Sequence, residues 1–293
     1  MLRRMLGSLG RRAFGARRLV LRVLLAALLI PLGCIYLWLL VLPWPLTLRW
    51  RDPAQTSFMK ERLQEADRDG EGLTVRQEWV PLEEISPNLR RAVLAAEDDR
   101  FYLHHGIDWR ALAEEAGYQG DTAFSWWDTE DRRALRKALT YVWSNRSDVK
   151  GRSTLTQQLA KNLYFTPERS LVRKVGEAVV AKRLEFFLTK DRILEIYLNV
   201  AEWGPGVFGA EAAARTYFDR GADDLTLEEA AALAATLPHP LTSNPRFRPA
   251  RMTWRKEMLL LRLRAPPPQP PPPVEVPLLP DTALSGRDTT SGR

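Results

Sequence analysis

The sequence has very little cysteine and histidine. Cys34 is the only cysteine among 293 residues, which excludes disulfide scaffolds and cysteine-based zinc sites. Three histidines, two of them adjacent, are too few for a histidine-rich metal cage. No internal repeat of about 20 to 50 residues stands out within residues 49–264.

The folded part of the chain lacks an excess of positive charge. Lys and Arg number 43 against 36 Asp and Glu, but seven of the arginines lie in residues 1–22, where no acid occurs. This basic arm accounts for the whole net charge of +7. A nucleic-acid-binding face needs clustered charge within the folded part. We therefore do not expect nucleic acid as a partner.

Charged side chains are absent between Val23 and Leu42. Twenty residues at 1.5 Å each span about 30 Å, the thickness of the hydrocarbon core of a bilayer, so we predict a transmembrane helix over residues 23–44. A cleavable signal peptide is the alternative, although its apolar core is usually only about 7 to 15 residues long. Because seven arginines precede the helix and Arg49 and Arg51 follow it, the positive-inside rule predicts a cytoplasmic N-terminus.

The C-terminal segment 265–293 is rich in proline and contains the string PPPQPPPP. Such a composition cannot bury a core and predicts a disordered spacer, with binding of a partner in extended form as the alternative. Residues 49–264 remain as the main domain.

Helix signals dominate this domain. Ser86 and Pro87 indicate the start of a helix whose apolar stripe ends at Glu97. The strand signal is confined to a short extended piece over Thr74–Val80. We therefore expect a mainly α fold, in which four further helices begin at the capping residues Ser153, Ser170, Thr189 and Thr226, the last with Glu229 in a capping box.

The predicted helix after Ser153 has one apolar and one polar face. At 100° per residue, the polar face carries Thr154, Gln157, Gln158 and Lys161 near the helix N-terminus, where free N–H groups favour an anion. A solvated surface is the alternative. Three cations follow within the next 13 residues and make a diphosphate site plausible, namely Arg169, Arg173 and Lys174.

Two glutamates lie in partly apolar surroundings. Glu97 follows an Ala-Ala pair, and Glu177 lies among valines and alanine. A carboxylate in such a place can accept a proton from a hydroxyl. Each can equally be a surface glutamate, and the spacing alone does not decide between the two interpretations.

Four segments of the domain read EDDRFYLHHGID from residue 97, GRSTLTQQLAKNLYF from residue 151, RKVGEAVVAKRLE from residue 173 and KDRILEIYLNVAEWGPGVFGAEAAARTYF from residue 190. In this order they resemble the signature motifs of the peptidoglycan glycosyltransferases. Within that family, the chain is most similar to the monofunctional biosynthetic peptidoglycan transglycosylases. Their one membrane helix and single domain match the organisation deduced above.

This resemblance implies a lysozyme-like, mainly α-helical domain with a larger head and a smaller, membrane-apposed jaw. It implies polymerisation of lipid II into β-1,4 glycan strands by inverting transfer, with release of undecaprenyl diphosphate. Transpeptidase activity is not expected, because the two S-x-x-K matches at Ser57 and Ser147 lack an accompanying K-T-G.

The resemblance also implies roles for individual residues. Glu97 corresponds to the general base that deprotonates the acceptor's 4-hydroxyl group. Lys161, Arg169 and a divalent cation, Mg²⁺ or Mn²⁺, would stabilise the departing diphosphate. Glu177 would orient this diphosphate or its metal, and no organic cofactor is implied. The further residues expected to bind substrate or shape the cleft are Ser153, Thr154, Gln157, Gln158, Asn162, Asp98, Phe101, His104, Arg173 and Lys174.

Two features depart from the family pattern. Arg152 occupies a position usually held by a small residue. The distance from Glu97 to Gly151 is a couple of dozen residues longer than usual, which places an insertion in the jaw at about 101–150. Its aromatic residues either dip into the lipid interface or form a small core of their own. Trp203, in a Gly-Pro-Gly context, is expected to shape a loop rather than to stack on sugar.

Two rival functions remain open at the level of sequence. A lysozyme-like hydrolase would cut glycan with two carboxylates. An inactive scaffold would be tethered by its helix and would recruit other cell wall synthesis or division proteins through the tail. The expected partners are lipid II, the nascent glycan strand and the bilayer, and the expected location is the bacterial inner membrane with the domain on the periplasmic side.

Overall fold

The computed structural model describes residues 2–118, 128–144, 153–166 and 170–265, and the side chains of residues 2–21, 139 and 141–143 are not described. The chain divides into two units, Met1–Leu263 and Arg264–Arg293. Arg152, Arg169 and nearly all of the proline-rich tail lie outside the described residues, as do the side chains of four aromatic residues of the jaw insertion, Phe124, Trp126, Trp127 and Trp143.

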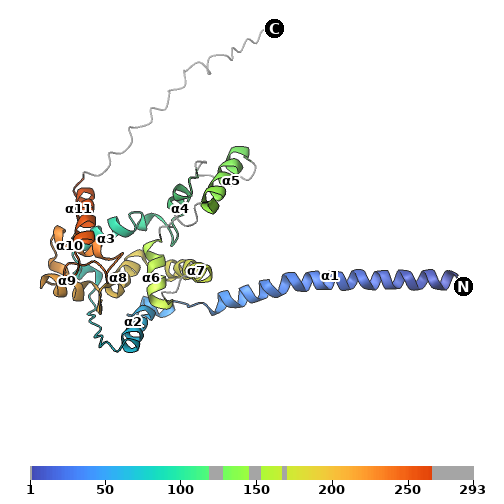
Figure 1. The fold of residues 1–293 in the computed structure, drawn as a ribbon, viewed down its shortest axis with the longest axis horizontal. Coiled ribbons are helices and arrows are strands. Elements are labelled where there is room, and N and C mark those ends of the chain that lie inside the picture. Colours follow the sequence, from blue (N-terminus) through green and yellow to red (C-terminus); the bar gives the residue numbers. More distant parts are fainter. Residues whose placement is uncertain (1, 119–127, 145–152, 167–169, 266–293) are drawn as a thin grey trace, which may run out of the picture. The chain divides into compact units, whose positions relative to one another are not determined.

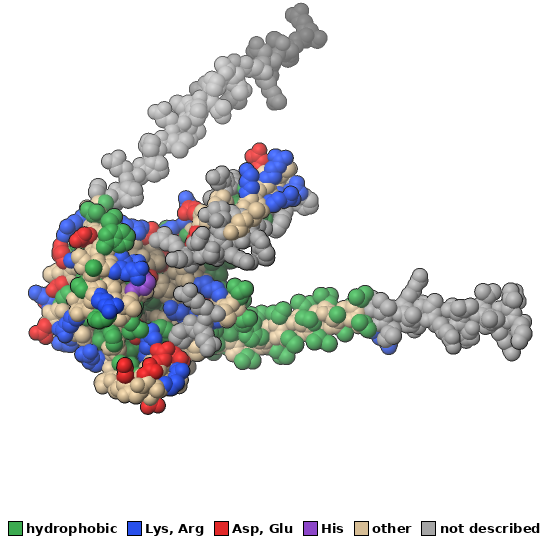
Figure 2. All heavy atoms as spheres, in the orientation of Figure 1, with side chains coloured by type: hydrophobic (Ala, Val, Ile, Leu, Met, Phe, Trp, Pro, Cys, Tyr) green, Lys and Arg blue, Asp and Glu red, His purple; other side chains and the backbone are tan. Residues whose placement is uncertain are grey.

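The first unit begins with one long helix, α1 (Leu2–Val41). Within residues 22–49, an 18-residue window has a mean hydropathy of 2.5, and none of that window is buried by the rest of the protein. Figure 2 shows hydrophobic side chains along the described part of this helix. It is therefore long and apolar enough to cross a membrane, as predicted, and its helical backbone continues back through the basic arm.

The remaining elements are mostly helices, which confirms the predicted mainly α fold (Figure 1). Helix α6 lies at the centre of the packing, because it contacts α2, α7 and α8, while α10 packs against α3. The core is formed by aliphatic stripes such as Leu155, Leu159 and Leu163 of α6. In chain order the helices are α2 (Ser57–Arg68), α3 (Pro87–Glu97), α4 (Trp109–Glu115), α5 (Thr129–Ser144), α6 (Leu155–Tyr164), α7 (Leu171–Phe187), α8 (Lys190–Val200), α9 (Ala210–Phe218), α10 (Leu227–Thr236) and α11 (Ala250–Arg264). Single 3₁₀ turns occur at Leu46–Arg49, Leu82–Glu84, Phe101–Leu103 and Ala222–Asp224.

Four of the five predicted helix starts are confirmed. Ser86, Ser170, Thr189 and Thr226 each accept a backbone hydrogen bond at the N-terminus of the helix that follows. The prediction for Ser153 was wrong by one residue, because Thr154 is the N-cap of α6.

Residues 74–80, predicted as a short extended piece, belong to neither strand of the two-stranded sheet. Only Arg76 of this segment makes a β-bridge, to Val207, and the two-stranded sheet consists of β1 (Glu202–Gly204) and β2 (Val207–Phe208). The segment is held instead by the side chain of Asn199, which donates to the carbonyl of Val80 over 2.8 Å and accepts from its N–H over 2.9 Å.

Helix α7 is fastened to the end of α1. The guanidinium group of Arg183 donates to the carbonyl of Leu39 over 2.6 Å and to that of Pro43 over 3.0 Å. It also lies 3.9 Å from the ring centre of Trp44, a cation–π contact. These bonds satisfy backbone carbonyls at and after the C-terminal end of the helix, which carry partial negative charge.

Candidate active site

Helix α6 presents its polar side chains in two groups. Thr154 and Gln157 form a capping box, in which each side chain accepts a hydrogen bond from the other's backbone N–H. The hydroxyl of Thr154 also donates to the carbonyl of Gly106 over 2.7 Å. These two residues therefore build the start of the helix rather than the pocket wall. Gln158, Lys161 and Asn162 line the pocket instead.

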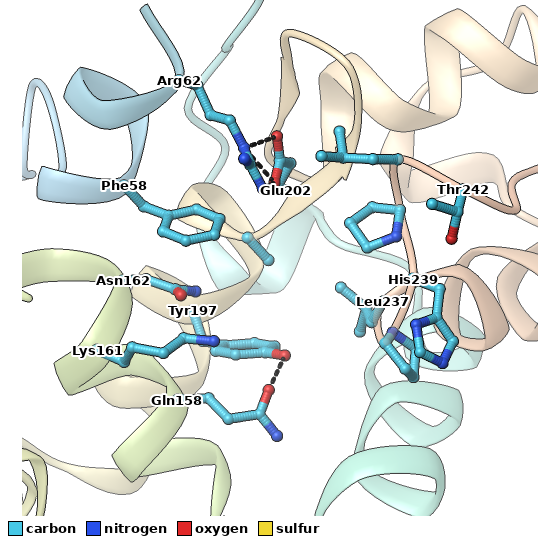
Figure 3. A pocket seen from close by; sticks show the side chains of 14 residues that line it. Phe58, Arg62, Gln158, Lys161, Asn162, Tyr197, Glu202, Leu237, His239 and Thr242 are labelled. Atoms are coloured by element: carbon cyan, nitrogen blue, oxygen red, sulfur yellow. Dashed lines mark hydrogen bonds and ion pairs between the residues drawn. The ribbon is translucent and has the colours of Figure 1, made fainter. Parts of the chain in front are cut away.

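The pocket has a volume of about 280 Å³ (Figure 3). Its walls come from four parts of the chain: α2, α6, the end of α8 with β1, and residues 237–242. Phe58, Arg62 and Glu202 were missed by the sequence analysis, as was the segment 237–242. The pairing of Arg62 with Glu202 joins residues 140 positions apart, so no local pattern signals it.

Gln158 connects the pocket to Glu97. Its amide nitrogen donates to Glu97 Oε2 over 2.9 Å, and its amide oxygen accepts from the hydroxyl of Tyr197 over 3.0 Å. Burial raises the pKa of Tyr197 well above its ordinary value, and the charges of Glu97 and Asp98 add to the effect. Tyr197 therefore remains protonated and donates to Gln158, whose orientation is fixed from both ends.

Asp98 and His104 join the Glu97 segment to the start of α6. The carboxylate of Asp98 accepts from the backbone N–H of Leu155 over 2.8 Å, where the helix dipole favours negative charge. His104 Nε2 lies 3.0 Å from both carboxylate oxygens. Phe101 is buried and meets the ring of His104 edge to face. These three predicted residues therefore lie together beside the start of α6 and are not part of the pocket lining.

Glu177 lies among cations. It is buried in α7, where it forms an ion pair with Arg173 one turn earlier and has the Lys174 ammonium 3.5 Å away. Lys174 also donates to the hydroxyl of Ser153 over 2.6 Å, which accounts for the position of that predicted residue. The two cations compensate the cost of burying the carboxylate.

Lys161 belongs to the same charged group. Burial lowers the pKa of Lys161, and the charges of Arg173 and Lys174 lower it further, while those of Glu177 and Glu97 raise it. Its ammonium lies 5.5 Å from the ring centre of Phe58. A partly desolvated ammonium at the pocket wall attracts anions strongly, because water screens it less than it screens a surface lysine.

The described side chains include no group of three or more His, Cys, Asp or Glu residues that could hold a metal ion. The Glu177 carboxylate already forms ion pairs with Arg173 and Lys174.

Trp203 is fully buried and its carbonyl accepts from the Tyr217 hydroxyl over 2.8 Å, which fits a packing role rather than sugar stacking.

Comparison with known proteins gives consistent results. Residues 67–121 and 118–264 match the Transglycosylase family. A "Biosynthetic peptidoglycan transglycosylase" of Dechloromonas aromatica is 41% identical over 221 residues, which cover 75% of this chain and 84% of the relative. A protein of the same name from Chromobacterium violaceum is 44% identical over 65% of this chain and 75% of the relative. Another from Aromatoleum aromaticum is 42% identical over 78% of this chain and 88% of the relative.

Proposed function

Because the chain belongs to the transglycosylase family and is a peptidoglycan glycosyltransferase of cell wall synthesis, we propose that it polymerises lipid II by inverting transfer at Glu97. The observation that carries this assignment is the bridge of Gln158 between Glu97 and the pocket that contains Lys161. Helix α6 carries both Lys161 and Gln158, and Gln158 connects this ammonium to the proposed proton acceptor Glu97 at the end of α3.

In the proposed reaction, Glu97 takes the proton from the 4-hydroxyl group of the acceptor sugar. The oxygen attacks the anomeric carbon of the donor as the bond from that carbon to the diphosphate oxygen breaks. The bonding electron pair leaves with undecaprenyl diphosphate, and the α-linked donor becomes a β-1,4-linked product. The hydrogen bond from Gln158 holds one carboxylate oxygen in a fixed direction, which favours proton transfer along a defined path.

The leaving diphosphate needs positive charge more than it needs a proton. Lys161 supplies an ammonium at the pocket wall, and Arg173 and Lys174 supply two more cations. Glu177 is proposed to hold these two side chains in place from its buried position on α7. Arg169 remains a proposed contact on the strength of the sequence motif, since it lies outside the described residues. A Mg²⁺ or Mn²⁺ ion would have to be held largely by the diphosphate itself.

The anchor is proposed to lie in the inner membrane with the basic arm in the cytoplasm and the domain in the periplasm. The arginine asymmetry supports this orientation. Helix α7, which Arg183 ties to the end of α1, exposes four large apolar side chains. Leu171 is 86% exposed and Phe186 81%, with Val172 and Val175 also exposed. Exposed apolar groups beside a membrane anchor are best accommodated by the lipid interface.

The proposal is tested with the full-length protein in detergent, given labelled lipid II in one reaction and preformed glycan strands in another. We expect a ladder of polymer that a muramidase degrades, and no cleavage of the preformed strands. Cleavage of preformed glycan without polymerisation would favour the hydrolase. A folded protein that does neither would favour the scaffold.

A further inference from the structure

The pocket wall contains an ion pair that the proposed reaction does not use. Arg62 of α2 binds the carboxylate of Glu202 in β1 through three hydrogen bonds of 3.0, 3.2 and 3.1 Å, two of them from Nε and one from Nη2 (Figure 3). The side chain of Glu202 is 3% exposed and that of Arg62 20%. Arg62 also donates to Glu65 over 2.6 Å.

This pair is well formed despite its burial. Desolvation raises the pKa of Glu202, and the hydrogen bonds and the charge of Arg62 oppose that rise. Burial likewise works against the charge of Arg62, but its bonds to Glu202 and Glu65 outweigh burial and raise its pKa. A buried bidentate pair contributes little net stability, yet it fixes the relative position of the two elements that carry it.

The elements fixed in this way are α2 and β1, and α2 carries Phe58. The ring of Phe58 lies between two cations, with the Arg62 guanidinium carbon 4.9 Å and the Lys161 ammonium 5.5 Å from its centre. Phe58 precedes Arg62 by one helical turn, so both side chains project from the same face of α2. The position of the ring against Lys161 therefore depends on where Arg62 is held.

We propose that the Arg62–Glu202 pair is a positioning device that holds Phe58 against Lys161 and thereby sets the affinity of the pocket for the anionic group of the donor. The pair acts through α2 and does not itself touch the reacting atoms. The expected effect on donor affinity rests on the proposed function. The claim that the pair holds Phe58 against Lys161 does not, because it concerns only the surroundings of the Lys161 ammonium.

Three variants separate the pair from general stability. Arg62→Met combined with Glu202→Met removes both charges and leaves none buried alone, so the fold is expected to survive. Phe58→Leu keeps the pair and removes only the ring. Arg68→Met, on the last turn of the same helix, removes an exposed arginine and serves as the matched control. Thermal unfolding of each variant establishes that it is folded.

The first measurement is the initial rate of lipid II polymerisation by the full-length variants. We expect the paired methionine variant and Phe58→Leu to raise KM at least fivefold with kcat within twofold of the parent, and Arg68→Met to change neither. A folded variant whose KM stays within twofold of the parent, or whose kcat alone falls, would overturn the inference.

The second measurement needs no substrate. Lys161 is acetylated with limiting acetic anhydride and the modified peptides are quantified by mass spectrometry, with exposed Lys60 as internal reference. If Phe58 covers the ammonium, acetylation of Lys161 should be at least threefold faster in the paired methionine variant and in Phe58→Leu. Unchanged acetylation would refute the positioning role even in an active enzyme. If the parent makes no polymer, the proposed function fails while this measurement still decides the inference.

Discussion

The hydrogen bond from Gln158 to Glu97 predicts a large effect of replacing that glutamine. Gln158→Met keeps the size of the side chain and removes both the donor to Glu97 at 2.9 Å and the acceptor for Tyr197 at 3.0 Å. A hydrogen bond to a charged group contributes about 1.5–3 kcal/mol. If that stabilisation acts in the transition state, kcat falls about 10- to 150-fold, since about 1.4 kcal/mol corresponds to a factor of ten.

Tyr197→Phe provides a graded comparison, because it removes only the neutral hydrogen bond behind Gln158. That bond is worth about 0.5–1.5 kcal/mol, so kcat should fall only about 2- to 10-fold. The assay is single-turnover consumption of labelled lipid II, with Gln64→Met as a control for the same substitution at an exposed position on α2. A Gln158→Met enzyme that keeps more than half of the parent's kcat would refute the argument that this bridge orients Glu97.

Three further predictions follow from the charges and exposed groups. Because burial lowers the pKa of Lys161, kcat/KM should begin to fall at a pH below the ordinary lysine pKa near 10.5. Lys161→Arg should move this fall to higher pH, because arginine stays protonated. A fall at the same pH in Lys161→Arg would contradict its assignment to Lys161. To test membrane contact of α7, a nitroxide label is attached to Val172→Cys in a Cys34→Ser protein in nanodiscs, and to exposed Glu83→Cys as the control. The label at position 172 should be protected from a water-soluble relaxation agent, and the label at position 83 should not. Equal accessibility of the two labels would contradict membrane contact of α7. Chelation by EDTA should slow polymerisation without abolishing it, because protein cations already surround Glu177, and complete loss restored by Mg²⁺ would show that they are insufficient.

Local signals in the sequence were sufficient for most helix starts. Ser170 and Thr189 were predicted as caps because a hydroxyl residue preceding an apolar stripe has a direct structural reason to lie there. The prediction for α6 was displaced by one residue because Ser153 and Thr154 can both cap. Only Thr154 has a glutamine three residues later to complete the capping box, and Ser153 accepts from Lys174 instead.

The site was predicted less completely than the fold. Glu97, Gln158 and Lys161 were singled out from the sequence, although their proximity followed from family resemblance rather than from spacing. Arg62 and Glu202 were missed, because their interaction depends on how α2 docks against β1. Polar and apolar side chains alternate over residues 74–80 as they do in a strand. The backbone of this segment bonds instead to the side chain of Asn199 and forms one β-bridge, at Arg76. Local periodicity does not encode these long-range contacts.

The most direct test of the account is the rate of lipid II consumption by Glu97→Gln at a lipid II concentration that saturates binding, measured beside the exposed control Glu84→Gln. A general base contributes about 10²- to 10⁴-fold, so the account predicts a loss of kcat in that range for Glu97→Gln with binding of lipid II unchanged and the control at the parent's rate. A Glu97→Gln enzyme that binds lipid II and polymerises it within tenfold of the parent would contradict the central claim.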